Sequence, residues 1–555
     1  MSKAHAVRQW ILIGLLGGAV AASAAAISQR SNDYAFFDPL IDVKAMIDQL
    51  YVEEFDRDKL QEGAIRGMLD VLGDPYTQYI PPSEASSFNE QISGEYVGIG
   101  AEVILKDGWI TIVTPLDDSP AFAAGLMADD RIVAIDGKTT ENEPIDASIA
   151  RMKGEPGTEV VLTIERDGKQ QEITVVRNHI RNRPVRGFHR LNDEDGRWQY
   201  LVDPARDLAY LRLSQFTEGA AQDVERALRD LGAFEGGLNG LVLDLRWNPG
   251  GLLSEAIAIS DLFLESGPIV STRTGGGRET VAEARARGTL PPMPVVILIN
   301  GQSASASEVL AGALTENPSF RDADGEPLAI ALGTRTFGKG SVQTVRPLES
   351  QPGAILKITE QKYYLPSGRS LHRLDDSTEW GVDPSPGFFV EMTTEQTREM
   401  LEARRRQSIL RRGGPADDPA VWSNAESILG ALKDPQLTAA VHALQARVET
   451  GAWSPVSEAD PSVDASQLAE LRRANDVRER LLRELDRLER RIAAISQGVA
   501  PEDRGVGFDL WPDETPIAGG TLIVRDAEGN EVTRLKITND NLERWLIDAG
   551  VEKQD

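Results

Sequence analysis

The 555-residue chain contains no cysteine and only five histidines. Without cysteine, the chain has no disulfides, no zinc sites with thiolate ligands and no cysteine nucleophile. Apart from one histidine near the N-terminus, the histidines lie in no recognisable triad motif, and neither Gly-x-Ser-x-Gly nor His-Glu-x-x-His occurs. No cluster of metal-ligating residues is evident either, so the sequence predicts neither a metal nor a cofactor.

Basic residues are fewer than acidic ones: the chain contains 59 Lys and Arg and 87 Asp and Glu, which gives a net charge of -28. This charge repels phosphate backbones and argues against a general nucleic-acid-binding protein. The hydrophobic fraction of 41% and the charged fraction of 26% are typical of folded soluble domains. At about 150 residues per domain, the length predicts three or four domains.

Long apolar runs are absent except for one, from Trp10 to Ala26, which follows Lys3 and Arg8. A basic start, an apolar run and small residues at its end are typical of an export signal. The run is also nearly long enough to stay in the membrane. Residues 1–27 are therefore expected to be either a signal peptide or an N-terminal anchor in the inner membrane. The remaining chain is expected in the periplasm or cell envelope.

The stretch GTRTFGKGS, from Gly333 to Ser341, partly matches the phosphate-binding pattern G-x-x-x-x-G-K-[ST]. Gly340 stands where that pattern requires a hydroxyl for magnesium, which disfavours a nucleotide site. If Lys339 is buried, it could act as a general base instead. A buried lysine loses its proton more readily and can then accept one from a serine hydroxyl. An ordinary surface lysine in a turn is the alternative.

Apolar periodicity divides the chain into parts and predicts a multidomain α/β protein. The β-rich part contains the turn Gly98-Ile99-Gly100, whose backbone N–H groups could hold a carboxylate beside a strand edge that takes an extended peptide. An ordinary hairpin turn is the alternative. The expected parts are a helical segment (34–90), a β-rich module (91–177), an α/β core (184–392), a helical linker (393–465) and a C-terminal region (466–555).

The C-terminal region carries leucine and isoleucine at alternating steps of four and three from Leu481 to Ile495, the spacing of a coiled-coil seam. The run covers few heptads, so a packing helix or helical hairpin is expected rather than a long zipper. After it, residues 520–537 predict a β-hairpin with its turn at 528–530, followed by a capped helix.

Several motifs taken together resemble the carboxyl-terminal processing proteases, also called tail-specific proteases, which are PDZ-containing serine peptidases. The resemblance runs from about Tyr34 to Val390 and keeps the order of the motifs. These are GAIRGML, GEYVGIG, LDLRWNPGG, NGQSASASEVLAGAL, GTRTFGKGSVQ and YYLPSGRSL.

The resemblance implies a Ser-Lys(-Gln) site. Ser305 would be the nucleophile, with Ser303 and Ser307 as near alternatives, Lys339 the base and Gln343 the residue that orients the lysine. The oxyanion would be bound by the N–H groups of Gly251 and Ala306. Gly338 and Gly340 would let the backbone approach closely around the lysine.

The resemblance further implies that residues 91–177 form a PDZ domain that binds the free C-terminus of a protein substrate. Gly98-Ile99-Gly100 would hold the carboxylate, Val97 and Ile99 would favour apolar C-terminal residues, and the helix around 145–152 would form the other wall of the groove. A gating role for this domain is a hypothesis from the same resemblance.

One departure from the family is the polar stretch TENPSFRDADGEPL, residues 315–328, between the serine and lysine motifs. It is expected either to form a surface loop or to cover the cleft. The expected function is an exported serine endopeptidase acting on accessible C-terminal tails. The alternative is a catalytically silent or partner-activated PDZ scaffold, with a homo-oligomer or an adaptor assembled through the C-terminal helix.

Overall fold

The computed structural model describes residues 35–191, 197–374, 377, 379–410 and 420–456, the strands at 521–525 and 531–536, and isolated helical positions from 471 to 488. They fall into two units, residues 1–466 and 467–555. The predicted signal segment, the last two residues of the heptad seam (Ile492 and Ile495) and the final helix lie outside the described residues, whereas Leu481, Leu485 and Leu488 are helical. Among the helices that are described, none is both long enough and apolar enough to cross a bilayer.

The second unit contains the predicted hairpin. Strands β22 (Thr521–Arg525) and β23 (Glu531–Lys536) pair antiparallel, with Leu522 opposite Leu535. Alternating apolar and polar residues fit this pairing. The predicted hairpin strands are confirmed, whereas the turn between them lies outside the described residues.

The first unit begins with the expected helices. Residues 35–50 are helical and are followed by α2 (Arg57–Asp70), strand β1 (Gln78–Ile80) and α3 (Pro82–Ser93). The side chain of Asp56 caps α2 by accepting hydrogen bonds from the N–H groups of Asp58 and Lys59.

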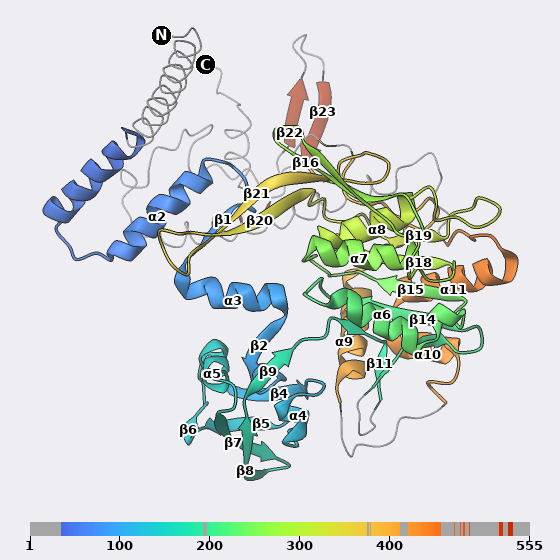
Figure 1. The fold of residues 1–555 in the computed structure, drawn as a ribbon, viewed down its shortest axis with the longest axis horizontal. Coiled ribbons are helices and arrows are strands. Elements are labelled where there is room, and N and C mark those ends of the chain that lie inside the picture. The colour runs from blue at the N-terminus through green and yellow to red at the C-terminus, as the bar shows by residue number, and fades with distance from the viewer. Residues whose placement is uncertain are drawn as a thin grey trace, which may run out of the picture. The chain divides into compact units, whose positions relative to one another are not determined.

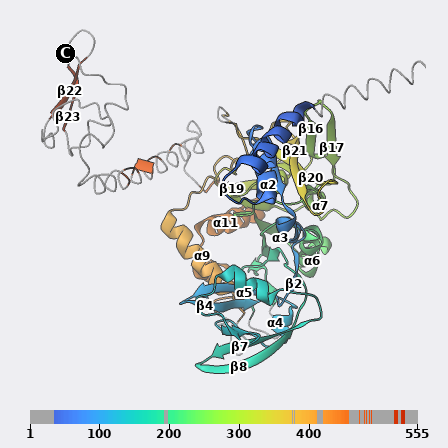
Figure 2. The ribbon, with the colours of Figure 1, turned by 90° about the vertical axis from the view of Figure 1, so that its left-hand side faces the viewer.

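The β-rich module follows as a separate small core, visible at the foot of Figure 2. Its five main strands pair in the order β3-β4-β5-β7-β8, with β6 beside β5 and a separate β2-β9 pair. The apolar members of the strands, among them Ile110, Ile132 and Leu162, are fully buried together. The elements are β2 (Glu95–Gly98), β3 (Ala101–Lys106), β4 (Trp109–Pro115), α4 (Pro120–Ala123), β5 (Arg131–Ile135), β6 (Lys138–Thr139), α5 (Ile145–Met152), β7 (Glu159–Arg166), β8 (Lys169–Val176) and β9 (Asn178–Arg181).

The α/β core is built on a sheet whose four central strands are parallel and nearly all buried. Such sheets are covered on both faces, which explains continuous apolar runs such as VVILI. The order is β10-β14-β15-β18-β19, with β13 beside β14. The bounds are β10 (Val185–Arg186), β13 (Leu201–Asp203), β14 (Leu208–Leu213), β15 (Gly240–Asp244), β18 (Val295–Ile299) and β19 (Ala329–Gly333).

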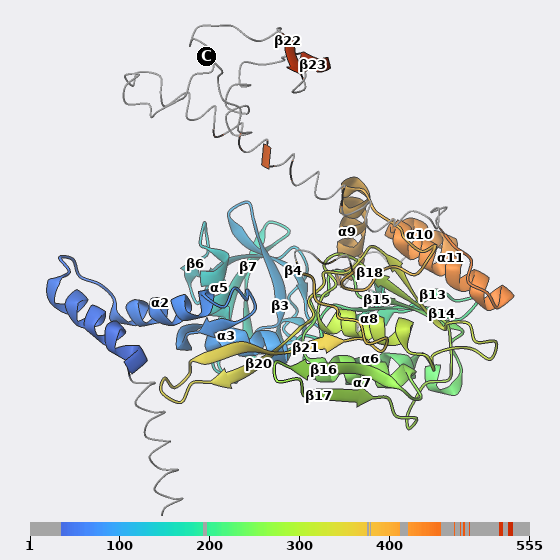
Figure 3. The ribbon, with the colours of Figure 1, turned by 90° about the horizontal axis from the view of Figure 1, so that it is seen from above.

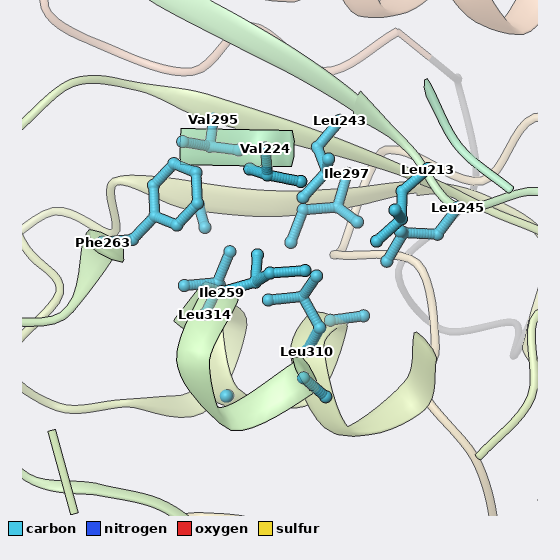
Figure 4. Packing of buried hydrophobic residues seen from close by; sticks show 14 of the residues in the cluster. Leu213, Val224, Leu243, Leu245, Ile259, Phe263, Val295, Ile297, Leu310 and Leu314 are labelled. Carbon is cyan, nitrogen blue, oxygen red and sulfur yellow. The ribbon is translucent and has the colours of Figure 1, made fainter. Parts of the chain in front are cut away.

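Helices cover both faces of this sheet (Figures 1 and 3). On one face lie α6 (Ala220–Asp230), α7 (Leu253–Phe263) and α8 (Ala306–Glu316). Figure 4 shows their apolar side chains, Ile259 and Leu310 among them, packed against Leu243 and Ile297 of the strands. The multidomain α/β architecture expected from the sequence is confirmed.

The other face is covered by α10 (Ala425–Leu432) and α11 (Pro435–Thr450), which follow α9 (Thr394–Ser408). Buried Leu437, Val441 and Leu444 pack against strand residues such as Val242. The helices predicted for residues 393–465 are present in the described part of that range, and α10 and α11 pack on the core sheet. The domain boundary at residue 393 stays a prediction. The apolar residues of these helices are evident in the sequence, but the sequence does not indicate which face of the sheet they cover.

A second, antiparallel sheet carries the lysine motif. Its order is β1-β21-β16-β17, with β20 (Ser341–Pro347) beside β21 (Ile355–Tyr364). Strands β16 (Pro268–Thr274) and β17 (Glu279–Glu283) complete it. Since β1 pairs with β21, this sheet joins the N-terminal segment to the core. Three smaller elements are β11 (His189–Arg190), β12 (Trp198–Gln199) and a 3-10 turn, Ala233–Glu235.

The inserted stretch 315–328 begins at the C-terminal end of α8. Its Asp322 pairs with Arg447 of α11, and the Trp453 indole donates to the carbonyl of Pro327 at 2.7 Å. Ser305 precedes the other end of α8, about 16 Å away at 1.5 Å per residue. The insertion is therefore held against α11, as a surface loop, and does not cover the serine.

Candidate active site

Ser305 occupies the N-cap of α8, in the turn that follows the buried strand β18. Its backbone has φ 57° and ψ -115°, a conformation that is strained for a residue with a side chain. Its N–H donates to the Glu308 carboxylate at 2.7 Å. The residue is only 5% exposed. A strained turn between strand and helix, held by a buried carboxylate, is a geometry that serves to present a nucleophile.

The two neighbouring serines have structural contacts. The Ser303 hydroxyl donates to the carbonyl of Leu245 at 2.8 Å, and the Ser307 hydroxyl donates to the carbonyl of Asn248 at 2.9 Å. Both serines are fully buried. Their hydroxyls fasten the serine turn to the Asn-Pro-Gly-Gly turn, which favours Ser305 over either alternative.

The Asn-Pro-Gly-Gly turn lies directly against the serine. A Cβ on Gly250 would lie 2.9 Å from the Cβ of Ser305, and a Cβ on Gly251 would overlap the carbonyl of Phe216. Within the described part of the chain, the N–H groups of Gly251 and Ala306 make no hydrogen bond. Two unused donors thus flank Ser305, as expected for an oxyanion site.

Lys339 lies in the turn between β19 and β20, where glycines allow close packing. A Cβ on Gly338 would lie 2.5 Å from the Trp380 ring, and one on Gly340 would overlap the backbone of His372. The expectation of close backbone approach at these glycines is confirmed.

The environment of Lys339 makes its ammonium group easier to deprotonate. Burial lowers the pKa of Lys339, and the positive charge of Lys357 lowers it further, whereas Glu308 and Asp74 act in the opposite direction. The Lys339 Nζ lies 4.8 Å from the centroid of the Tyr76 ring. A lysine with a lowered pKa is suited to accept a proton.

Glu308 links the serine turn to the lysine turn, and the sequence reasoning missed it. This fully buried carboxylate accepts hydrogen bonds from the N–H groups of Ser305 (2.7 Å), Gly338 (2.6 Å) and Lys339 (2.9 Å) and from the Thr336 hydroxyl (2.6 Å). Burial raises its pKa, and these hydrogen bonds oppose the rise. The Ser-x-x-Glu spacing at the start of a helix was the available signal.

The backbones of Ser305 and Lys339 meet at Glu308, but their side chains form no hydrogen bond with each other among the described residues. The Ser305 hydroxyl instead interacts with Tyr363, and burial raises the pKa of that phenol to about 12. Gln343 Nε2 donates to Ser341 at 2.8 Å and to Thr359 at 3.1 Å rather than contacting Lys339. Catalytic hydrogen bonds often tighten only when substrate binds.

A segment from the N-terminal region completes this site. The Thr77 hydroxyl donates to Asp74 at 2.6 Å and accepts from the N–H of Thr359 at 3.0 Å. Thr359 in turn accepts from Gln343. With Tyr76 over the lysine, this segment lies against the lysine side of the site. Nothing in the spacing along the chain indicated such a contact over more than 250 residues.

The loop predicted to hold a carboxylate, Gly98-Ile99-Gly100, joins β2 to β3 in the β-rich module. Gly100 has φ +75°, and a Cβ there would overlap Ser119. The N–H groups of Ile99 and Gly100 have no partner among the residues that the structure describes. Strand β3 follows at the edge of its sheet. Ile99 is buried in the module's core, and Val97 is half-buried in β2 opposite His179.

Comparisons with known proteins agree with this geometry. Residues 207–385 match Peptidase family S41, residues 97–176 match PDZ domain, and residues 20–83 match Activating protease CtpB N-terminal domain. These matches cover the core, the β-rich module and the N-terminal segment.

Individual proteins similar to this chain are also described as C-terminal processing or serine proteases. A carboxy-terminal-processing protease of Bartonella bacilliformis is 34% identical over 79% of this chain and 94% of its own. A probable CtpA-like serine protease of Staphylococcus haemolyticus is 36% identical over 58% of this chain and 60% of its own. The solved photosystem II D1 C-terminal processing protease is 27% identical, covering 66% of this chain and 90% of its own, with a TM-score of 0.36. The chain therefore belongs to the carboxy-terminal-processing proteases of peptidase family S41, as a serine-type peptidase with a PDZ domain.

Proposed function

We propose that the peptidase cleaves by a Ser-Lys mechanism, with Ser305 as the nucleophile and Lys339 as the general base. The observation that carries this proposal is the Glu308 carboxylate, which accepts hydrogen bonds from the backbone N–H groups of both residues. Through one buried group, the two turns are held in a fixed relation. The unused N–H groups of Gly251 and Ala306 beside the serine support the same assignment.

In this mechanism the Ser305 Oγ attacks the carbonyl carbon of the scissile bond while its proton passes to the neutral Lys339 amine. The resulting oxyanion accepts hydrogen bonds from Gly251 and Ala306. The Lys339 ammonium then protonates the leaving amine, and water hydrolyses the acyl-enzyme with the lysine again as base. Gln343 would orient Lys339 after exchanging its present hydrogen bonds with Ser341 and Thr359.

The PDZ domain would select the substrate by its C-terminus. The terminal carboxylate would accept hydrogen bonds in the loop Gly98-Ile99-Gly100 while the peptide adds a strand to the free edge of β3. Ile99 and Val97 give the loop an apolar character and would favour apolar C-terminal residues. The helix α5 would form the other wall of the groove.

We also propose that the protein is exported and works in the periplasm or cell envelope. The charged start and apolar run of residues 1–27 support export. Whether that segment is cleaved or anchors the protein to the inner membrane is decided by N-terminal sequencing of the protein from the membrane fraction. A homo-oligomer or an adaptor bound through the C-terminal helix would be revealed by deleting residues 467–496, which should abolish assembly and leave the catalytic residues untouched.

Cleavage of a loosely folded reporter with an apolar C-terminal tail tests the mechanism. Ser305→Ala and Lys339→Ala should each abolish cleavage, whereas the exposed controls Ser86→Ala and Lys362→Ala should retain it. All four variants should bind the tail peptide as the parent does. If the parent binds the tail but cleaves nothing, the silent or partner-activated scaffold becomes the better account.

A further inference from the structure

Two arginines face each other across neighbouring strands, and none of the described residues provides a counter-ion for either. In the antiparallel pair of β10 and β14, Arg186 is directly opposite Arg212. Like charges in opposite positions on adjacent strands destabilise a sheet. The Arg212 Nε is buried and has no hydrogen-bond partner. Neither guanidinium forms an ion pair or a hydrogen bond with any residue that the structure describes.

The nearby carboxylates are already matched by other arginines. Asp244 and Asp434 are shared by Arg246, at 2.7 and 2.6 Å, and by Arg404, at 2.9 and 3.7 Å. These two carboxylates balance Arg246 and Arg404, so in the described part of the chain no carboxylate is left over to pair with Arg212 beside Arg404.

The described residues on the PDZ side of the cavity form no ion pair with either arginine. Asp117 is paired with Arg190. Glu102 is exposed and lies beyond ion-pair distance of Arg186, although its charge acts on that residue's pKa. Burial lowers the pKa of both arginines, and that of Arg212 falls to about 10, still well above neutral pH.

The paired arginines line a cavity of about 200 Å³ between the catalytic core and the PDZ domain. Its walls come from β10, β14 and α9 on one side and from β3 and β4, with Thr114, on the other. A water molecule occupies about 30 Å³ of liquid volume, so a small anion with a few waters fits. Arg405 of α9 also lines the cavity and is exposed.

We propose that Arg186 and Arg212 bind a doubly charged tetrahedral oxyanion, of which inorganic phosphate is the simplest example. Two guanidinium groups present forked donors that match the oxygens of such an ion, and its charge equals the two positive charges left over. The ion would lie between elements of both domains and would stabilise the packing of the PDZ domain on the core. This site is distinct from the serine, the lysine and the carboxylate loop.

Thermal unfolding and isothermal titration calorimetry of the full chain test the proposal, with phosphate compared with chloride at equal ionic strength. Phosphate should raise the melting temperature of the parent by roughly 2 °C or more, because a ligand that binds only the folded state stabilises it. Arg212→Gln should weaken phosphate binding at least tenfold. In chloride the same variant should melt no lower than the parent, because it removes one of two facing positive charges. A structural arginine would lower the melting temperature in both buffers.

The control is Arg226→Gln, an exposed arginine already paired with Asp223, which should keep the full response to phosphate. Arg186→Gln provides a second variant if Arg212→Gln does not fold. The proposal is overturned if phosphate gives the parent no shift beyond chloride, if the shift persists in both arginine variants, or if acetate acts as strongly as phosphate.

Discussion

At the scale of single residues, the proposed mechanism makes activity depend on the protonation state of Lys339. Its pKa lies below the ordinary 10.5 because of burial and the Lys357 charge. Since the base must be neutral, activity should rise as the pH increases through this lowered pKa. Lys357→Met removes a positive charge that disfavours the ammonium form, so the pKa of Lys339 should increase. The acidic limb of the kcat profile should then move to higher pH.

The matched control is Lys362→Met, an exposed lysine on the same strand whose charge is not among those that shift the pKa of Lys339. Its pH profile should follow that of the parent. An acidic limb that moves to lower pH in Lys357→Met, or does not move, would show that Lys357 does not tune the base.

Glu308 provides a second test at this scale, as a positioning residue. Glu308→Gln places an amide NH₂ among three N–H donors and a hydroxyl, so at least one hydrogen bond to the former carboxylate is lost. A hydrogen bond to a charged group contributes about 1.5–3 kcal/mol, so kcat should fall by one to two orders of magnitude. KM and the affinity for the tail peptide should stay near parental values. An unchanged kcat would show that Glu308 does not position the catalytic residues.

At the scale of elements, a buried ion-pair network fastens strand β15 to helix α11. Arg246 is fully buried and donates to Asp244, the last residue of β15, and to Asp434. Asp434 also caps α11 by accepting from the N–H of Leu437. Asp434→Ala leaves a buried guanidinium short of a partner. Breaking such a pair costs about 3–5 kcal/mol, so the melting temperature and the urea midpoint should both fall clearly.

An exposed ion pair gives the comparison. Glu449 pairs with Arg206 at 2.7 Å, where both side chains are largely exposed. Glu449→Ala should change stability by no more than about 1 kcal/mol. Equal losses in the two variants would mean that the buried network does not fasten α11 to the sheet.

At the scale of the whole molecule, the proposed function assigns tail binding to the PDZ domain and bond cleavage to the catalytic core. Gly100→Ala introduces a Cβ that overlaps Ser119 at a backbone φ of +75°, which distorts the carboxylate loop. We expect at least tenfold weaker binding of a tail peptide, measured by fluorescence anisotropy, and slower cleavage of a tailed reporter. Cleavage of a short peptide that does not depend on the tail should be retained.

Gly125→Ala in the same domain is the control for local strain, because it also has a positive φ but no atom within 4 Å of the added Cβ. It should bind the tail peptide nearly as the parent does. Equal losses in both variants would indicate general destabilisation of the PDZ domain instead of a carboxylate-loop effect.

The sequence by itself determined the elements and the reactive residue types. Apolar runs such as VVILI predicted buried strands, and alternation predicted the strands of the PDZ domain and the C-terminal hairpin, because these patterns depend on local periodicity. The order of the motifs indicated the protease family, and the glycines around Lys339 indicated close packing. All of these signals lie within short stretches of chain.

Only the tertiary structure decided which distant residues meet. The lysine contacts Tyr76 from the N-terminal segment, Glu308 joins two turns, and helices α10 and α11 pack on the core sheet. The structure also placed the insertion against α11 and set Arg186 opposite Arg212. Periodicity shows that a face is buried but not what covers it, and charge composition shows how many ions a chain carries but not which remain unpaired.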